Sequence, residues 1–352
     1  MLSKDKNIIH NILFIRLSSI GDVVLTTPLL RQFHKAYPSC NIDFVTTSLT
    51  AGIFRFNPYV RQIFTYDKTW DKNRISQFKS EIIKSNSGVY DIIIDLQNNL
   101  RSGFLRKDLG KSILNVNKRR LNKLALVYFK KPYYDNIVHV VDNYRMTLND
   151  PSIMNDEQGL EIWLENDKKN NSYLSSEFLH IQKDILNIAI APGAHHFSKR
   201  WPSEYFVHLI NQLSSSIKCN IVLIGGEPDR ELLESISKVS MPDNEVFIGK
   251  SIIETAQKLD ECSLLITNDT GVMHIASARQ VPVLVIYGST VPALGFTPYK
   301  VKNAIIERKD VPCRPCTHIG KANCPKKHFE CMTLIKPLDV LALVKSMLDS
   351  II

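Results

Sequence analysis

Short apolar runs typical of buried strands alternate with helical segments along most of this chain. The expected strands cover 11–17, 42–47, 62–66, 90–96 and 112–116 in the first half, and 186–191, 220–225, 245–248, 263–267 and 281–287 in the second. Helical patterns lie between most of these runs, for example at 27–37, 202–214 and 252–260. Such alternation predicts parallel sheets covered by helices, and therefore an α/β fold.

A polar stretch at 149–183, rich in Asn, Ser, Lys and Glu, separates the two series and is interpreted as a linker or hinge. A chain of 352 residues is long for one hydrophobic core, so two domains are expected. We expect Rossmann-like domains at 1–165 and 166–336, followed by a helix within 337–352 that packs back across the domains. Ligands of such folds bind at the carboxyl ends of the strands.

The composition is that of an ordinary globular protein, with 44% hydrophobic and 22% charged residues. No apolar stretch approaches the roughly 20 residues of a membrane-spanning helix, and Arg16 closes the short apolar run near the N-terminus. We therefore expect a cytoplasmic protein without a signal peptide.

Basic residues exceed acidic ones by 44 − 35 = 9, and the excess is concentrated. Residues 97–135 contain ten Lys and Arg residues but only two Asp residues. This basic stretch suits an anionic partner, namely a phosphorylated substrate, an anionic membrane surface or a nucleic acid. The alternative is a solvated face with no binding role.

The sequence ILFIRLSSIGDVV, residues 12–24, ends an expected core strand in polar groups. Arg16, Ser18, Ser19, Gly21 and Asp22 would therefore lie at the ligand-binding edge of a sheet. Asp22 could act as a base for a hydroxyl nucleophile, or it could simply cap the following helix. A dinucleotide-binding fingerprint is not indicated, because only Gly21 of the G-x-G-x-x-G pattern is present.

The sequence TNDTGVMHIASA, residues 267–278, passes from an expected buried strand straight into a helix. Unpaired N–H groups at the start of that helix, together with the helix dipole, favour a diphosphate there. The residues concerned are Asp269, Thr270, Gly271, Val272 and His274. In the alternative interpretation, Asp269 or Thr270 is a plain cap and His274 is a half-buried residue without a ligand.

Two further strand ends carry charged residues. Lys199, in APGAHHFSKRWPSEYF at 191–206, is a cation suited to a phosphate leaving group, although lysines are commonly just solvated. Glu227, in IVLIGGEPDRE at 221–231, is preferred over Asp229 as an acceptor of ribose hydroxyl hydrogen bonds. Alternatively, both acids only begin the next helix, where the dipole favours them.

Four of the seven cysteines are clustered as Cys313-x2-Cys316-x7-Cys324-x6-Cys331. The first pair has zinc-knuckle spacing, so the cluster is a candidate structural zinc site; reduced thiols and a redox disulfide are the alternatives. No ligand set resembles an open catalytic metal site, so we expect catalysis without a metal.

Taken together, an ordered set of motifs resembles glycosyltransferase family 9, the ADP-heptose:lipopolysaccharide heptosyltransferases and their relatives. The motifs are RLSSIGD at 16–22, DLQ at 95–97, PGA at 192–194, SKRWP at 198–202, GGE at 225–227 and NDTGVMH at 268–274. The resemblance covers about residues 12–332. It implies a GT-B fold, with two Rossmann-like domains facing each other across a cleft, and an inverting, metal-independent sugar transfer.

The resemblance also implies residue roles. Asp22 resembles the base that deprotonates the acceptor hydroxyl, and Lys199 resembles the cation beside the donor phosphates. Glu227 resembles the ribose contact, and the residues at 269–274 resemble the donor-binding junction. Acceptor or anion binding would involve Arg16, Ser18, Ser19, Gly21, Gln97 and Arg101. Because the base and the donor would lie on different domains, the resemblance implies that the cleft closes for catalysis.

The implied partners are a nucleotide sugar, with ADP-heptose as first choice, and an anionic glycolipid acceptor of the lipopolysaccharide core. Peripheral contact with the inner membrane is also expected, and nucleic acid is not. One departure concerns acceptor contacts: members often show His-x-x-(acidic)-Arg-Asn, whereas here Arg145 is shifted relative to His139. Alternatives are a transferase using another nucleotide sugar, a GT-B nucleotide-sugar epimerase and, remotely, a nucleic-acid-binding protein with a zinc knuckle.

Overall fold

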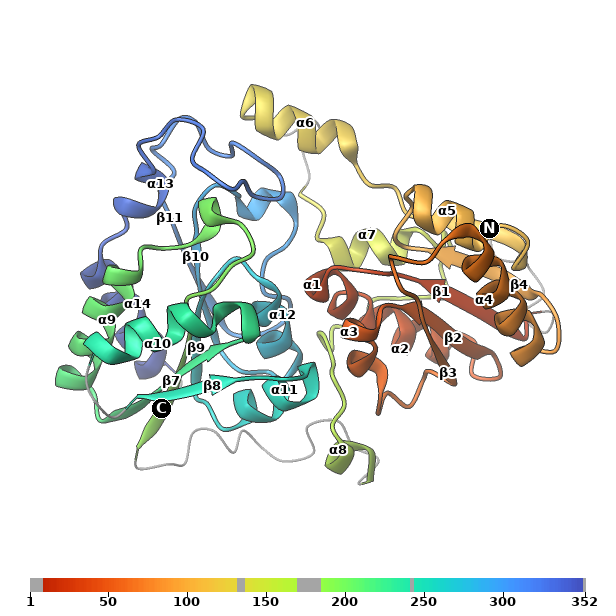
Figure 1. Ribbon diagram of the computed structural model, residues 1–352, viewed down its shortest axis with the longest axis horizontal. Coiled ribbons are helices and arrows are strands. Elements are labelled where there is room, and N and C mark those ends of the chain that lie inside the picture. The colour runs from red at the N-terminus through yellow and green to blue at the C-terminus, as the bar shows by residue number, and fades with distance from the viewer. Residues whose placement is uncertain (1–8, 132–136, 170–184, 241–243, 351–352) are drawn as a thin grey trace. The chain divides into compact units, whose positions relative to one another are not determined.

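The computed structural model describes residues 9–131, 137–169, 185–240 and 244–350, and these form two compact units (Figure 1). The first unit contains the described residues 9–118 and 138–169, and the second contains 119–131, 137 and 185–350. A single boundary near residue 165 does not describe this division. Residues 119–131 belong to the second unit, although they precede residues 138–169 of the first unit in the sequence. None of the helices in the described ranges combines the length and hydropathy needed to cross a bilayer.

The first unit is built on a five-stranded parallel sheet with strand order β3-β2-β1-β4-β5. The strands are β1 (Asn11–Ile15), β2 (Asn41–Thr46), β3 (Gln62–Thr65), β4 (Tyr90–Asp95) and β5 (Gly110–Asn115). The central strands β1 and β4 carry consecutive apolar residues, at 12–15 and 92–94, that are buried on both faces, as expected for a parallel sheet covered by helices. All five expected strands are confirmed, with ends shifted by one or two residues.

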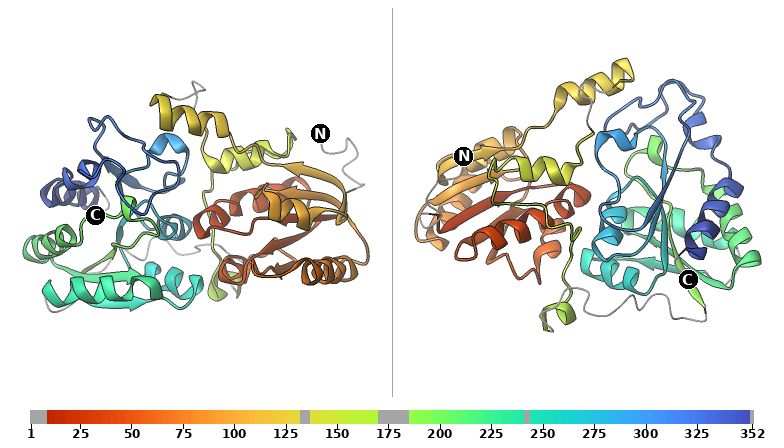
Figure 2. Two further views of the ribbon diagram at one scale, coloured as in Figure 1. Left: turned by 45° about the horizontal axis from the view of Figure 1, so that its top comes forward. Right: turned by 180° about the vertical axis from the view of Figure 1, so that it is seen from behind.

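Helices pack on both faces of this sheet, as Figure 2 shows for the first unit. The helices of this unit are α1 (Ile20–Val24), α2 (Thr27–Ala36), α3 (Ser48–Ala51), α4 (Lys72–Ser85), α5 (Leu100–Arg106), α7 (Val140–Met146) and α8 (Glu165–Lys169), of which α8 lies away from the sheet in Figure 1. Local chemistry starts several of them: Asp71 accepts a hydrogen bond from the Arg74 N–H at the start of α4, and Asn99 and Ser102 form a capping box at α5.

The second unit contains a six-stranded parallel sheet with strand order β11-β10-β9-β6-β7-β8. Its strands are β6 (Leu186–Ala191), β7 (Cys219–Gly225), β8 (Glu245–Ile248), β9 (Leu264–Asn268), β10 (Val283–Tyr287) and β11 (Asn303–Glu307). Five of these strands agree with the prediction. The edge strand β11 was not predicted, because its short run carries no clear turn signals.

The helices of this unit are α6 (Arg120–Phe129), α9 (Ser203–Ser216), α10 (Arg230–Val239), α11 (Ile252–Asp260), α12 (Gly271–Ala278), α13 (Glu330–Thr333) and α14 (Pro337–Asp349). The last helix, α14, contacts α9 and β11 within this unit. Its buried residues join one core cluster with the strands and with the indole of Trp201. This differs from the expectation of a helix packed across both domains, because its apolar face is filled by its own unit.

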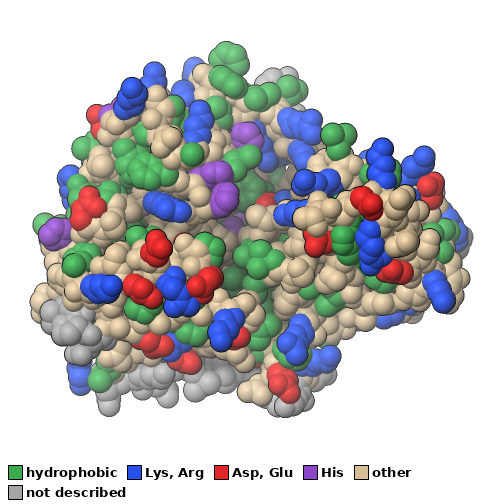
Figure 3. All heavy atoms as spheres, viewed as in Figure 1, with side chains coloured by type: hydrophobic (Ala, Val, Ile, Leu, Met, Phe, Trp, Pro, Cys, Tyr) green, Lys and Arg blue, Asp and Glu red, His purple; other side chains and the backbone are tan. Residues whose placement is uncertain are grey.

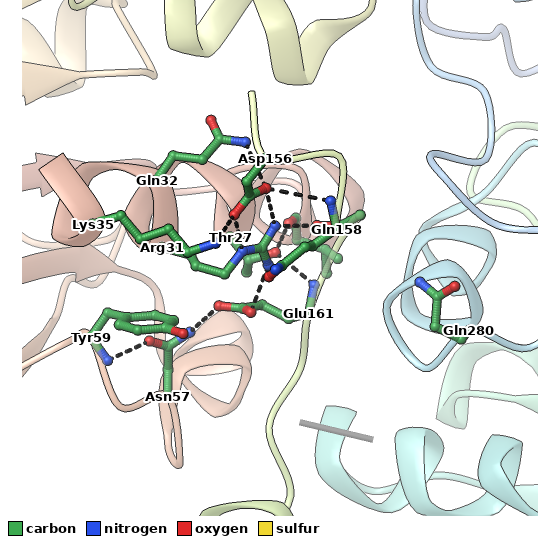
Figure 4. Close-up of polar contacts among 12 residues, drawn as sticks. Thr27, Arg31, Gln32, Lys35, Asn57, Tyr59, Asp156, Gln158, Glu161 and Gln280 are labelled. Carbon is green, nitrogen blue, oxygen red and sulfur yellow. Dashed lines mark hydrogen bonds and ion pairs between the residues drawn. The ribbon is translucent and has the colours of Figure 1, made fainter. Parts of the chain in front are cut away.

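The described part of the expected linker, 149–169, is instead fixed to the first unit (Figure 4). The buried Arg31 guanidinium of α2 makes two hydrogen bonds to the Asp156 carboxylate, at 2.7 and 2.9 Å, and one to Glu161 at 2.7 Å. Residues 160–164 are themselves buried. The remainder of the expected linker, 170–183, lies outside the described residues.

Each sheet has one topological switch point, where the strand order reverses. It falls between β1 and β4 in the first sheet and between β6 and β9 in the second. Crevices outside the carboxyl ends of strands at such points are the usual ligand sites of open α/β sheets. Functional groups of each unit are therefore expected in the loops after these four strands.

Candidate active site

The loop after β1 delivers a buried ion pair to the switch point of the first sheet. Arg16, directly after the strand, donates from Nη1 to the Leu96 carbonyl after β4 at 2.5 Å. Its Nη2 lies 2.6 Å from the Asp22 carboxylate, and the side chains of this pair are 11% and 20% exposed. The guanidinium also lies 5.7 Å from the centroid of the Tyr144 ring. Arg16 thus holds Asp22 and joins the two strand ends.

Asp22 takes part in capping α1, as the alternative interpretation suggested, but as the capping-box partner of Ser19 and not as the N-cap residue itself. Ser19 is the N-cap of α1, and Asp22 is the third helical residue. One Asp22 carboxylate oxygen accepts hydrogen bonds from the Ser19 hydroxyl at 2.7 Å and the Ser19 N–H at 3.2 Å. Burial alone would raise the pKa of the Asp22 carboxyl, but Arg16 and Ser19 outweigh it and hold that pKa below its ordinary value. Asp22 is therefore an ionised carboxylate at neutral pH.

Other residues expected to bind the acceptor have different positions. The Gln97 side-chain oxygen accepts hydrogen bonds from the backbone N–H groups of Leu17 and Ser18, at 3.0 and 3.3 Å. Gln97 therefore fastens the loop that carries Asp22. Gly21 is buried in α1, whereas Arg101, in the first turn of α5, is exposed. The structure brings all of these except Arg101 into the strand-end loop or its direct support.

The switch point of the second sheet carries a second ion pair. Lys199, in the loop after β6, lies 2.7 Å from the Asp269 carboxylate at the end of β9, with side chains 15% and 11% exposed. The same Asp269 oxygen accepts a hydrogen bond from the Thr290 hydroxyl at 2.7 Å. Asp269 therefore orients the Lys199 ammonium, and its contact with the donor, implied by the sequence resemblance, stays a prediction.

The loop that carries Lys199 is fastened from both sides. Asn268 donates to the Pro192 carbonyl at 2.8 Å and accepts from the Trp201 N–H at 3.1 Å. The Ser198 and Ser289 hydroxyls lie 2.9 Å apart. These buried contacts fix the loop over ten residues, so Lys199 is held by the fold and not only by its ion pair.

The start of α12 has the properties expected of an anion site. Thr270 is its N-cap residue with extended backbone, and its side chain makes no capping hydrogen bond. Gly271 and Val272 form the first turn and are partly exposed. Because the Thr270 side chain does not accept hydrogen bonds from the first-turn N–H groups, these groups can donate to an anion. His274 is buried, at 3% exposure, which is more than the half-burial of the alternative interpretation, and its role toward a ligand stays a prediction.

Glu227 and Asp229 differ in their burial and in their contacts. A Cβ on Gly193 would come within 2.3 Å of the Asp229 carboxylate, and Asp229 also accepts from the Gly226 N–H at 3.2 Å. Asp229 is therefore a packed structural residue. Glu227 has an exposed side chain that pairs with Arg230 at 2.7 and 2.8 Å, which lowers its carboxyl pKa. Glu227 is the acid of this pair that a ligand can reach.

The four clustered cysteines line one small cavity, together with Ser198, Ser289 and His328. All four are free thiols, and burial raises the pKa of Cys331 to about 12. Within the described ranges, which include all four cysteines, no group of three or more His, Cys, Asp or Glu side chains could hold a metal ion. The candidate zinc site and its alternatives therefore stay predictions.

Sequence reasoning missed several residues that organise the two switch points. Tyr144 is buried against Arg16, and Thr290 supports Asp269 from the loop after β10. Arg314 is also buried, and it donates to the Gly288 carbonyl at 2.5 Å and the Thr290 carbonyl at 3.0 Å. The GST motif at 288–290, polar residues directly after an apolar strand, was the one signal that could have indicated Thr290.

Two parallel α/β units, each with charged side chains at its switch point, are the architecture of GT-B glycosyltransferases. The chain belongs to glycosyltransferase family 9 (heptosyltransferase), whose family model matches residues 81–327. The expected family and fold class are thereby confirmed.

Individual relatives agree with this assignment over the whole chain. Lipooligosaccharide heptosyltransferase 2 of Campylobacter jejuni is 26% identical over 346 residues, which is 96% of this chain and 98% of that protein. The glycosyl transferase family 9 structure from Veillonella parvula has a TM-score of 0.74 at 22% identity, covering 97% and 98% of the two chains. The E. coli ADP-heptose lps heptosyltransferase II has a TM-score of 0.71 at 20% identity, covering 97% and 99%.

Proposed function

We propose that this chain transfers a heptose from ADP-heptose to a sugar hydroxyl of a lipopolysaccharide-core acceptor, with inversion at the anomeric carbon. The acceptor oxygen forms the new bond to that carbon, and the bond from the carbon to the diphosphate oxygen breaks. The electron pair leaves with ADP, and the proton of the acceptor hydroxyl passes to Asp22. Membership of a heptosyltransferase family and the names of the similar proteins support the choice of donor and acceptor.

The observation that carries the assignment of the base is the environment of Asp22. Its carboxylate is 20% exposed at a switch point, is kept ionised by Arg16, and is fixed by Ser19. A base must be unprotonated and correctly positioned before the reaction begins. The ion pair lowers its intrinsic basicity, so we propose that Asp22 accepts the proton late, as the glycosidic bond to the diphosphate breaks.

Lys199 is proposed to stabilise the charge that develops on the departing diphosphate. Its support is the pairing with Asp269, which holds the ammonium near the start of α12 in the same unit. The first-turn N–H groups of α12 would bind the same diphosphate, and Glu227 would accept hydrogen bonds from the ribose. These groups supply the charge stabilisation that a metal gives in other transferases, so we propose transfer without a metal cofactor.

The test of the donor site is calorimetric titration of the purified protein with ADP, UDP, GDP and CMP in the presence of EDTA. Selective ADP binding that is lost in Lys199→Ala is the expected result. Lys258→Ala is the matched control, because Lys258 is also 15% exposed and paired with carboxylates in the same unit. Preference for another nucleotide would contradict the ADP-sugar assignment, and equal loss in both variants would contradict the role of Lys199.

An acceptor built on a lipid would bring the enzyme to a membrane, so we also propose that it works at the cytoplasmic face of the inner membrane. The alternative of an epimerase is separated by its substrate requirement. An epimerase turns over the nucleotide sugar without an acceptor, whereas the proposed transferase consumes donor only when acceptor is present.

A further inference from the structure

Helix α6 exposes an apolar face that the fold does not cover. Leu121, Leu124 and Tyr128 are 58%, 47% and 73% exposed, and their spacing of three and four residues places them on one side of the helix. Phe129, at the end of the helix, is 77% exposed. Isolated exposed apolar residues are normal, but four large ones within nine residues of one helix indicate an interaction surface.

The opposite side of α6 is attached to the second unit. Asn122 and Leu126 are buried. Lys130 donates hydrogen bonds to the carbonyls of Cys313 and Pro315, at 3.0 and 2.8 Å, and the Lys123 ammonium lies 5.6 Å from the centroid of the Phe296 ring. The helix is therefore held with one face docked, and its exposed apolar face is a property of the folded unit and not of a loose segment.

The charges around this face have one sign. Residues 119–131 contain five basic residues and no acidic residue. Arg120 and Lys131, at the two ends of the helix, are exposed. In Figure 3, hydrophobic side chains gather over α6 at the top of the view, with Lys and Arg side chains beside them. An apolar helix face with basic flanks is the pattern of helices that lie in the headgroup region of anionic membranes.

The basic stretch at 97–135 does not form one surface, because the fold places its two parts in different units. Its first part belongs to the first unit, where Arg106 and Lys111 pair with Asp95 and Asp91. Those charges are partly neutralised by their partners. In this part the exposed apolar side chains are Leu100, Phe104 and Ile113, on two different elements. The second part, on α6 and its two flanks, combines basic charge with four large exposed apolar side chains on one helix, the combination that lipid binding requires.

We propose that α6 is a membrane-docking helix that binds the surface of an anionic lipid bilayer. Leu121, Leu124, Tyr128 and Phe129 enter the boundary between headgroups and acyl chains, and Arg120 and Lys131 contact anionic headgroups. The biological reason for such docking, a lipid-anchored acceptor, rests on the proposed function. Binding of empty vesicles is measured without donor or acceptor, so this proposal and the proposed function fail independently.

The test is co-sedimentation of the full chain with vesicles of phosphatidylethanolamine and phosphatidylglycerol, and with vesicles of phosphatidylcholine alone. The wild-type protein is expected to bind the anionic vesicles, with a partition coefficient at least tenfold higher than for the zwitterionic ones. Leu121→Ser/Tyr128→Ser is expected to lower this coefficient about tenfold, because apolar area no longer enters the bilayer. Arg120→Glu/Lys131→Glu is expected to lower binding to anionic vesicles to the zwitterionic level.

The matched control is Val239→Ser/Leu338→Ser, which removes apolar side chains that are 67% and 64% exposed on other helices of the same unit. It should bind vesicles like the wild type, and all variants should retain their helical content and nucleotide binding. Unchanged vesicle binding of Leu121→Ser/Tyr128→Ser, or an equal loss in the control, would overturn the proposal. Light scattering that shows a dimer dissociated by the α6 substitutions, without vesicle binding, would overturn it in favour of a second copy of the chain.

Discussion

Replacing Asp22 with Asn separates the chemical role of this residue from its structural role. An Asn side chain has nearly the same shape and can still accept the Ser19 hydrogen bonds, which are 2.7 and 3.2 Å long in the wild type. It can neither accept a proton nor neutralise Arg16. We therefore expect kcat to fall by about 10² to 10⁴, the range for loss of a general base, which corresponds to about 3–5 kcal/mol of barrier.

The same substitution has a stability cost that the structure bounds. Removing one partner of a fully buried ion pair costs roughly 3–5 kcal/mol. The Asp22 side chain is 20% exposed, and Arg16 keeps its bond to the Leu96 carbonyl and its contact with the Tyr144 ring. We therefore expect Asp22→Asn to lower the free energy of unfolding by about 1–3 kcal/mol. The folded protein then remains the dominant species in the assay.

The pH dependence of this loss has a definite sign. The pKa of the Asp22 carboxyl is lower in the folded than in the unfolded protein, so the pair stabilises the fold above the unfolded pKa. The stability difference between wild type and Asp22→Asn should therefore be constant from about pH 5 to 8. It should shrink as the pH falls below about 4 and the folded-state carboxylate becomes protonated.

The assay combines initial transfer rates, urea unfolding and ADP titration for Asp22→Asn and a control, Asp91→Asn. Asp91 is also a mostly buried carboxylate, paired with Lys111 at 2.8 Å, but it lies at the start of β4, away from the carboxyl edge of the sheet. The control should lose stability without losing kcat. Retained kcat in Asp22→Asn, or a collapse of its ADP affinity, would refute the assignment of Asp22 as the base.

Three further substitutions test other parts of the account. Arg16→Gln should raise the pKa of the base carboxyl and move the acid limb of the kcat profile to higher pH; an unmoved limb would contradict the pairing. Asp269→Asn should weaken ADP binding about threefold to tenfold, and Lys199→Ala should weaken it more than tenfold, as measured by calorimetry. Wild-type ADP affinity in Asp269→Asn would show that Asp269 does not position the lysine. Arg31→Met should lower the free energy of unfolding by about 3–5 kcal/mol, because it leaves the buried Glu161 carboxylate without its cation. The loss should be larger at pH 8 than at pH 5. Burial already raises the pKa of the Glu161 carboxyl, and at the lower pH the carboxyl can become protonated and no longer needs a cation. A loss below about 1 kcal/mol in urea unfolding would contradict that interpretation.

The strands were predictable because their cause is local. The strands β1, β4 and β9 each contain three or four consecutive apolar residues, as expected of strands in a sheet buried on both faces. Each run ends where polar residues begin, so the loops carrying Asp22, Lys199 and Asp269 could be identified from the sequence. The parallel direction of the strands then follows from their alternation with helices.

Pairings between distant residues were not predictable, because no local pattern encodes them. Lys199 and Asp269 are 70 positions apart, and each alone looks like an ordinary polar residue at a strand end. Similarly, nothing in the polar composition of 149–169 indicates that Asp156 and Glu161 are fixed by Arg31. The sequence therefore located the candidate groups and left their partners to the tertiary structure.

The position of α6 shows a third kind of limit. Its residues continue the basic stretch that begins in the first unit, so charge alone suggested one continuous patch. Burial of Asn122 and Leu126, and the anchoring of Lys130 on the carbonyls of Cys313 and Pro315, attach the helix to the second unit. Contacts across about 180 residues decide this attachment, and helical periodicity does not.

The central claim is heptosyl transfer from ADP-heptose, and a transfer assay analysed by mass spectrometry tests it most directly. The purified chain is incubated with a heptose-free lipopolysaccharide-core acceptor and ADP-heptose, and in parallel with ADP-glucose or UDP-glucose. We expect that the acceptor gains the mass of one heptose with ADP-heptose alone, that ADP is released in equal amount, and that Asp22→Asn abolishes most of the product. Transfer only from another nucleotide sugar, or turnover of ADP-heptose when no acceptor is present, would contradict it.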